Sequence, residues 1–301
     1  MATMTATATA PEETIGMLVK RWRERRRRSQ LDLSLAAEMS ARHLSYIETG
    51  RSNPSPAMIE RICDELDVPL RERNRLHLAA GFAPVYRERP LTDLGAAQEA
   101  VRAVLAGMEP NPAVAVNVHW DLLAANEAME AFLRDLPGEL RRAPVNMLRA
   151  TLHPDGLAAQ IANLGQWRSH VVRRVRRQLE RTDADGLSAL LAELEAYGPP
   201  PPPDAPITTT DGTTADDLVV PLRMTTPYGD LALLYTATVF GSPRDVTLDE
   251  IAIETFFPAD RATADVLRSL ADLRTSGPPR EAAHLPEPEQ REAPTRAASR
   301  G

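Results

Sequence analysis

Aromatic residues are scarce in this chain: they make up 4% of its 301 residues, so its apolar cores must be built mainly from Ala, Leu and Val. A single cysteine, Cys63, excludes an internal disulfide framework and any cysteine-rich zinc site. No apolar run approaches the length of about 18 residues that a membrane-spanning helix needs. Residues 1–10 lack the basic-then-apolar order of a secretory signal, so the sequence predicts a cytoplasmic protein.

Basic residues are outnumbered by acidic ones, which gives a formal net charge of −7, but the charge is unevenly distributed. Residues 11–90 carry a net charge of +3, and residues 14–51 within them carry +5. Residues 91–301 carry −10. A basic head on an acidic body is typical of a nucleic-acid-binding module joined to a part that does not touch nucleic acid.

Residues 14–80 show the apolar periodicity of five short helices. Serines that can act as N-caps precede the second, third and fourth of them, at Ser29, Ser40 and Ser55. The second and third helices, over 30–37 and 41–49, have the layout of a helix-turn-helix. Their inward positions are small or apolar and are occupied by Leu33, Ser34, Ala37, Met39, Leu44 and Ile47.

The outward face of the third helix predicts a DNA-reading surface, because its side chains can then enter a major groove. Arg42 and Tyr46 are expected to read sequence, whereas Gln30 and Arg51 are expected to anchor the phosphate backbone. The full set expected to contact DNA is Gln30, Ser40, Ala41, Arg42, His43, Ser45, Tyr46, Arg51 and Asn53. The alternative is a helical hairpin used only for packing or protein contact, but the basic first helix favours DNA.

Helical and strand patterns mix after residue 91. Strands are expected over 113–118, 122–125, 218–225, 231–240 and 251–257. Helices are expected over 93–108, from Asn126 onward, over 187–197 and over 262–273. A long helix is expected to open at the segment 153–156 and to continue through Leu179. No catalytic constellation, nucleophile elbow or phosphate-binding loop is found, so an enzyme in this region has no supporting motif.

Several segments carry a family resemblance. Residues 14–80 resemble the Xre family of five-helix, repressor-like DNA-binding domains. The segments HLAAGFAPVY (77–86), WDLLAAN (120–126), HPDGL (153–157), GSPRDVTL (241–248) and ETFFPAD (254–260) resemble, in order, the MmyB-like subfamily of bacterial transcription regulators. Two departures stand out: Glu38 occupies a turn position where the family usually has glycine, and the prolines at 199–203 lengthen a loop.

The resemblance implies an α-helical N-terminal repressor-like helix-turn-helix domain plus an α+β PAS-like C-terminal domain. The expected divisions are a disordered N-terminus (1–13), the DNA-binding domain (14–82), a linker (83–92), the sensor domain (93–273) and a disordered tail (274–301). It implies a homodimer on an inverted-repeat DNA operator in the bacterial cytoplasm, at the nucleoid when DNA is bound. The sensor domain would bind a small apolar ligand, for which a fatty acid is the candidate. No cofactor and no metal are expected.

The register of the first and third helices also predicts a partly buried ion pair between Arg23 and Glu48, and the resemblance to repressor-like domains supports it. Trp167, Arg223 and Tyr235 are the candidate ligand-binding residues, with Arg223 proposed for an anionic head group. Core packing of the two aromatic residues, and a solvent-facing Arg223, are the competing interpretations. A ligand-free regulator whose C-terminal domain only dimerises or docks a partner is the alternative function.

The remaining polar candidates are weaker. His119, His153 and His170 share no metal-ligand spacing, so structural or capping roles are favoured over metal binding. Six arginines between 168 and 181 favour a solvated helix face over a ligand site.

Overall fold

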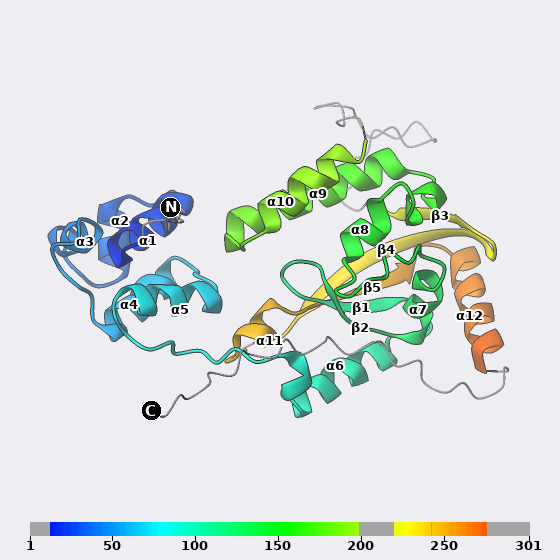
Figure 1. Cartoon of the computed structure of the whole chain (residues 1–301), viewed down its shortest axis with the longest axis horizontal. Helices are drawn as coiled ribbons and strands as arrows, with labels where there is room; N and C mark the ends of the chain where they lie inside the picture. Colours follow the sequence, from blue (N-terminus) through cyan, green and yellow to red (C-terminus); the bar gives the residue numbers. More distant parts are fainter. Residues whose placement is uncertain (1–12, 199–219, 242, 276–301) are drawn as a thin grey trace, which may run out of the picture.

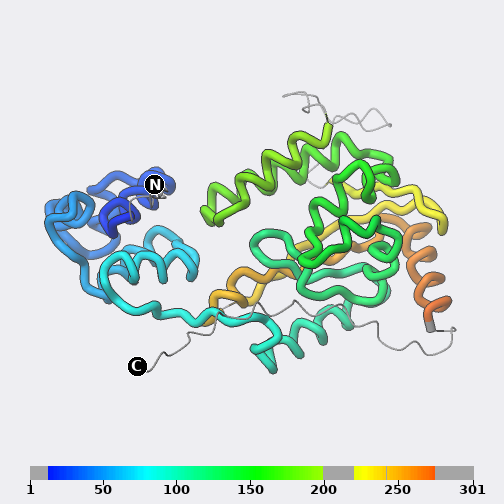
Figure 2. Tube along the Cα trace, viewed as in Figure 1, coloured from blue at the N-terminus to red at the C-terminus, as the bar shows by residue number. Residues whose placement is uncertain are grey.

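The computed structural model describes residues 13–198, 220–241 and 243–275 (Figure 1). The expected disordered ends, apart from Glu13 and residues 274–275, and the proline run at 199–203 lie outside the described residues. The trace in Figure 2 separates an N-terminal helical head from a larger C-terminal body that contains all of the described strands.

The head consists of five helices, as the periodicity predicts. They are α1 (Ile15–Arg25), α2 (Gln30–Ala36), α3 (Ala41–Glu48), α4 (Pro56–Glu65) and α5 (Leu70–Ala79). The expected serine caps are in place, and Thr14 caps α1 in the same way. The apolar stripes of the five helices meet in one core around the fully buried Trp22, and Cys63 is a buried member of that core.

Two backbone features set the approach of the helices in the head. A Cβ atom at Gly16 would lie 2.4 Å from the carbonyl oxygen of Ile47, so glycine allows α1 to contact the end of α3. In the turn between α2 and α3, Glu38 has φ +52°, a left-handed conformation that costs a non-glycine residue about 1–2 kcal/mol. Glu38 therefore adopts a backbone conformation that favours glycine, at the position where the family usually has glycine.

The C-terminal body is an α+β domain around a five-stranded antiparallel sheet, which confirms the expected fold class. Its strands are β1 (Ala113–Val116), β2 (Leu122–Ala125), β3 (Leu222–Thr226), β4 (Gly229–Val239) and β5 (Ala252–Pro258), in the order β2-β1-β5-β4-β3. Because side chains alternate along a strand, Glu254 and Phe256 face one side of the sheet and Ile253 faces the other.

Helices cover both faces of the sheet (Figure 1). The larger core lies beneath α8 (Met147–Leu152), α9 (Leu164–Thr182) and α10 (Leu187–Ala196). The smaller core lies beneath the short helix η1 (Leu91–Asp93) and α6 (Ala96–Gly107). The remaining helices are α7 (Glu127–Leu133), the 3-10 helix η2 (Leu157–Gln160), α11 (Val246–Glu250) and α12 (Arg261–Thr275).

The prediction of one long helix from the segment 153–156 is wrong. Residues 157–160 form η2, and α9 begins only at Leu164. Between the two helices, Ile161 makes a β-bridge to Met224 and the Ala162 amide donates to the Arg223 carbonyl at 2.9 Å. This pairing with β3 satisfies backbone groups that a continuous helix would have satisfied internally.

Two short helices, α8 and α11, were not expected from the sequence. Each is capped by the residue before it, Asn146 and Asp245 respectively. In the part of the chain that the structure describes, no helix is both long and apolar enough to cross a membrane.

Candidate DNA-reading face and ligand pocket

The recognition helix α3 is held in place by the expected ion pair. Arg23 of α1 donates to both carboxylate oxygens of Glu48, from Nε at 2.6 Å and from Nη2 at 3.0 Å, which confirms the predicted register. Nη1 of the same guanidinium donates to the Arg28 carbonyl at 2.9 Å, and Gln30 donates to Glu48 at 2.8 Å. The hydrogen bond and the charge of Glu48 raise the pKa of Arg23, although burial opposes this.

The outward face of α3 carries a cation flanked by an aromatic ring. Arg42 is exposed, and its Nε donates to the Tyr46 hydroxyl at 2.8 Å. The guanidinium carbons of Arg42 and Arg51 lie 5.4 and 5.9 Å from the centroid of the Tyr46 ring. The Tyr46 ring thus lies between two arginines, which face solvent with positive charge.

The structure places the other expected DNA contacts at the edges of this face. Ser40 accepts from the His43 amide at 3.1 Å, so its hydroxyl is a helix cap. Asn53 donates to the Ala80 carbonyl at 2.9 Å and thereby ties the loop after α3 to the end of α5. Gln30 bonds Glu48, as described above, while Ala41 and Ser45 are half-buried.

An apolar pocket lies in the C-terminal domain between the sheet and the helices α7 and α8. Apart from the hydroxyl of Thr151, its lining side chains are apolar. They are Pro112, Met129, Phe132, Met147, Thr151, Leu157, Ile161, Leu222, Met224, Leu233 and Phe256. The cavity among them has a volume of about 40 Å³, well below the roughly 300–1,000 Å³ of small-molecule sites, so a ligand would have to push the lining side chains apart.

Aromatic residues of α9 lie beyond one wall of this pocket. The ring of Phe256, a lining residue, is 6.4 Å from the ring of Tyr235 on β4. Tyr235 in turn makes a 2.6 Å hydrogen bond with His170 Nε2 and an edge contact with Trp167. Burial, reinforced by Arg174, lowers the pKa of His170 to about 4, so this ring is neutral at pH 7. Trp167 is buried, and its Nε1 has no hydrogen-bond partner among the described residues.

A buried charge pair continues this cluster. Arg174 of α9 pairs with Glu254 of β5, and its guanidinium carbon lies 4.4 Å from the Trp120 ring centroid and 4.9 Å from that of Tyr235. Burial raises the pKa of Glu254, while the charge of Arg174 opposes that shift. The interpretation of the α9 arginines as one solvated face is therefore wrong for Arg174 and for the buried Arg168.

Arg223 does not join these groups. It is exposed on the outward side of β3, between the pocket residues Leu222 and Met224, because successive side chains point to opposite faces of a strand. Tyr235 and Trp167 do come together, but beside the pocket rather than among its lining residues. The sequence analysis did not predict the pairing of Arg174 with Glu254. The signal for it was Glu254 itself, a charged residue inside the apolar strand expected over 251–257.

A metal centre has no support within residues 13–198, 220–241 and 243–275, since no group of three or more His, Cys, Asp or Glu there could hold an ion. The single cysteine, Cys63, is buried, and burial raises the pKa of its thiol to about 12. A buried thiol with a raised pKa is a poor nucleophile.

Comparisons with known proteins find a match in each of the two parts of the chain. Residues 97–270 match the MmyB-like transcription regulator ligand binding domain, and residues 14–76 match a helix-turn-helix domain. No curated protein matches the chain. A solved structure described as an RNA-binding Light-Oxygen-Voltage Receptor has 11% sequence identity and a TM-score of 0.24. The match covers 87% of this chain and 64% of that one, and a similarity this low supports no conclusion.

Proposed function

Because the chain belongs to the MmyB-like transcription regulators, we propose that it reads a specific DNA operator through α3 and senses a fatty-acid-like ligand in its apolar pocket. Members of this family are transcription regulators and not enzymes, with a helix-turn-helix DNA-binding domain and a ligand-binding domain. The apolar pocket is the observation that carries the ligand assignment.

The reading face supports the operator proposal. Arg42 lies in the first turn of α3, where side chains of a helix-turn-helix reach base edges, and arginine pairs well with guanine. Its hydrogen bond to Tyr46 orients the guanidinium before DNA arrives. Arg51, Gln30, Ser40, Ala41, His43, Ser45 and Asn53 complete the proposed contact set.

Selection of an operator from random DNA, followed by binding measurements, tests this assignment. Arg42→Ala should weaken operator binding by about 1–3 kcal/mol and relax the sequence preference at one position. Arg51→Ala should weaken specific and non-specific DNA alike, because it contacts phosphate in this scheme. Equal operator affinity of Arg42→Ala and the unaltered protein would refute the role given to Arg42.

A fatty-acid-like ligand agrees with the chemistry around the pocket. The apolar lining would surround an alkyl chain without leaving a polar group unpaired once its side chains move apart to enlarge the cavity. Tyr235, His170 and Arg174 offer polar groups beyond the Phe256 wall. A carboxylate head would find a cation there at Arg174. The exposed position of Arg223 does not support a head-group role for it, while Trp167 and Tyr235 lie behind the Phe256 wall.

Isothermal titration with sodium decanoate, dodecanoate and tetradecanoate tests the ligand class. Binding should be lost when Leu233→Arg introduces a charge into the pocket, whereas the exposed Arg223→Gln variant should bind normally. Absence of heat with all three acids, together with no lipid in extracts of the purified protein, would favour the alternative. In that case the C-terminal domain serves dimerisation or protein docking.

We further propose a homodimer that binds an inverted repeat with half-sites about one helical turn apart, in the bacterial cytoplasm at the nucleoid. Sedimentation of the protein with and without a selected operator tests the dimer. The division at 82 and 93 remains a prediction, which limited proteolysis between the head and the body would check.

A further inference from the structure

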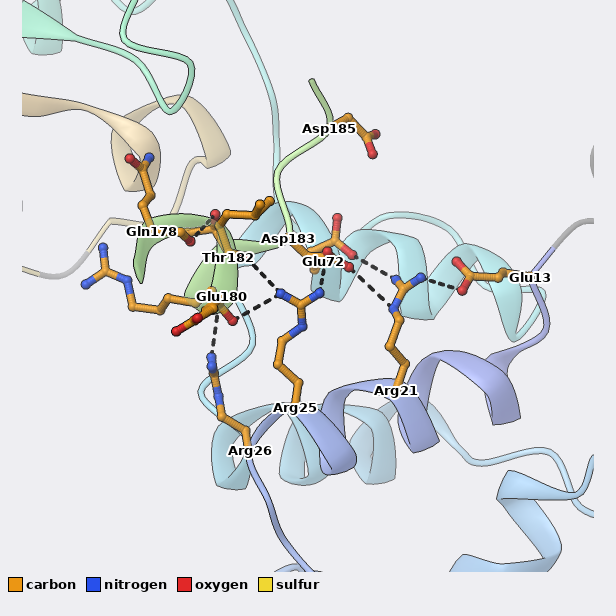
Figure 3. Close-up of polar contacts among 12 residues, drawn as sticks. Glu13, Arg21, Arg25, Arg26, Glu72, Gln178, Glu180, Thr182, Asp183 and Asp185 are labelled. Atoms are coloured by element: carbon orange, nitrogen blue, oxygen red, sulfur yellow. Dashed lines mark hydrogen bonds and ion pairs between the residues drawn. The ribbon is translucent and has the colours of Figure 1, made fainter. Parts of the chain in front are cut away.

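The carboxyl end of α9 is held by side chains of the head (Figure 3). Arg25 of α1 donates from Nη1 to the carbonyls of Leu179 and Glu180, at 2.8 and 3.1 Å. Nη2 of the same guanidinium pairs with Asp183. The Leu179 carbonyl also accepts from the Asp183 amide at 3.0 Å. The carboxyl end of a helix carries partial negative charge, so a cation from another domain is stabilising there.

Two neighbouring arginines extend this contact. Arg26 donates to the Arg181 carbonyl at 3.2 Å, and Arg21 lies 3.4 Å from Asp183 (Figure 3). We call Arg21, Arg25 and Arg26, together with the last turn of α9 and Asp183, the arginine clasp.

The clasp is anchored in the core of the head. The guanidinium carbons of Arg25 and Arg26 lie 5.5 and 5.2 Å from the centroid of the buried Trp22 ring. Arg26 also donates to the carbonyls of Leu66 and Asp67, both at 2.7 Å. One helical position after Trp22, Arg23 holds the recognition helix through Glu48, so α1 contacts α9 and α3 at once.

The middle of α9 contacts residues next to the pocket wall. His170 bonds Tyr235, Arg174 pairs with Glu254, and Tyr235 contacts the lining residue Phe256. Val171, Val172 and Val175 bury the helix in the same core that contains the pocket residues Met224 and Leu233. The middle of α9 thus contacts the pocket wall through Tyr235, and its carboxyl end contacts the head.

The head makes a second contact with the C-terminal body, between α5 and α11. Arg71 of α5 binds Glu250 of α11 through two hydrogen bonds, 2.6 and 3.0 Å long, and the Leu70 amide donates to Asp249 at 3.2 Å. The α5–α11 contact and the arginine clasp are thus two separate attachments of the head, and Arg75 of α5 adds an ion pair to Asp185 beside the clasp, with 3.9 Å between Nη1 and Oδ1. A displacement at the clasp alone would turn the head about the α5–α11 contact.

We propose that α9 couples the ligand pocket to the DNA-binding head through the arginine clasp. This inference rests on the proposed ligand function. A ligand that moves Phe256 and Tyr235 shifts α9, and the clasp transmits the shift to α1 and α3. In Figure 1, α3 lies on the side of the head away from α9, so the clasp orients the reading face without covering it. The ligand changes operator affinity only if it favours one of the two clasp states.

Two variants break the clasp from opposite sides. Arg25→Gln removes a positive charge from the head, and Asp183→Asn removes a negative charge from the body. A non-specific electrostatic effect on DNA affinity would have opposite signs in the two variants, whereas loss of the clasp acts in the same direction in both. Lys20→Gln is the matched control, because Lys20 is an exposed residue of α1 whose pair with Glu24 spans 3.9 Å.

The first readout uses no ligand. Hydrogen exchange of residues 178–185 in the full chain should accelerate at least fivefold in both clasp variants and stay unchanged in Lys20→Gln. Phe256→Ala, which removes the wall side chain next to Tyr235, should change operator affinity by at least fivefold in the clasp-intact protein and by less than twofold in Arg25→Gln. The same response of Phe256→Ala with and without the clasp would overturn the proposal.

The second readout uses sodium dodecanoate. Saturating dodecanoate should change the operator affinity of the unaltered protein by at least fivefold and that of Asp183→Asn by less than twofold, although both proteins bind dodecanoate. Because coupling is reciprocal, saturating operator should change the dodecanoate affinity by the same two factors. Dodecanoate binding that leaves the operator affinity unchanged would overturn the coupling but not the ligand function. Absence of dodecanoate binding would count against the ligand function, and the first readout would still decide the coupling.

Discussion

The head and the C-terminal domain each bury an arginine–glutamate pair, and the two pairs differ in construction. In the head, Glu48 accepts two hydrogen bonds from Arg23 and a third from Gln30. In the C-terminal domain, Glu254 pairs with Arg174, whose cation lies against Trp120 and Tyr235. Hydrogen bonding is the largest influence on the pKa of Arg23 and raises it, whereas burial is the largest influence on Glu254 and raises its pKa.

The difference follows from what each pair joins. Arg23 and Glu48 connect two helices of one small bundle, and removal of either partner leaves a charge in a closed site. Arg174 and Glu254 connect a helix to a strand across a domain, next to a pocket that the proposed function fills and empties. Three hydrogen bonds to Glu48 fix the geometry of the pair in the head, whereas the cation of Arg174 is also attracted to the faces of two aromatic rings.

The largest expected effect breaks the pair in the head. Glu48→Ala should lower the free energy of unfolding of the head by about 3–5 kcal/mol, because it leaves Arg23 buried without its partner. Thermal unfolding followed by the fluorescence of Trp22 measures the loss, with Trp120 and Trp167 replaced by Phe to isolate the signal. Glu24→Ala, whose carboxylate is 57% exposed and lies 3.7 Å from Arg23, should cost less than about 1 kcal/mol. Equal losses in the two variants would contradict the role given to Glu48.

A second substitution tests how closely the pair holds α1 against α3. Gly16→Ala should destabilise the head by about 1–3 kcal/mol, since its Cβ would lie 2.4 Å from the Ile47 carbonyl oxygen and 2.8 Å from that of Glu48. Gly107→Ala in α6 is the control, because no atom lies within 4 Å of the added Cβ, and it should be neutral or stabilising. Urea unfolding of both variants measures the difference, and a neutral Gly16→Ala would show that the helices can separate freely.

The third prediction concerns the polar cluster of the C-terminal domain. The folded protein lowers the pKa of His170 to about 4 from an ordinary value of 6.5, so the unfolded chain binds the proton first as the pH falls. The stability contributed by neutral His170 is fully present above pH 6.5 and is lost progressively down to pH 4. Allowing for solvent screening of this half-buried ring, the loss should be about 1–2 kcal/mol. Urea unfolding of His170→Gln should lack this part of the pH dependence, and an identical pH profile would contradict it.

The smallest expected effect concerns backbone strain in the head. Glu38→Gly should stabilise the head by about 0.5–1 kcal/mol, because glycine adopts the left-handed conformation at φ +52° without a steric penalty. The gain is smaller than the strain itself, since glycine loses more conformational entropy on folding. Differential scanning calorimetry with Glu38→Ala as the comparison checks it, and an Ala variant as stable as the Gly variant would exclude backbone strain as the cause.

The sequence by itself determined the head almost completely. Serine caps, helical periodicity and the register of Arg23 and Glu48 all act within a few turns of chain, and the structure has the helices where these signals put them. The same holds for the Asn126 cap and for the strand at 122–125 in the C-terminal domain. Local hydrogen bonds and neighbouring side chains are sufficient for such elements, so their pattern can be read without the rest of the molecule.

Only the tertiary structure decided where α9 begins, which arginine faces the interior and what the end of α9 touches. Ile161 leaves the helical path because β3, some sixty residues later, offers it a strand partner. Arg174 and not Arg223 points inward, since the face of a strand or helix that becomes buried depends on its neighbours. The contact of Arg25 with Leu179 joins residues 154 positions apart, and no local pattern encodes a hydrogen bond whose acceptor belongs to another domain.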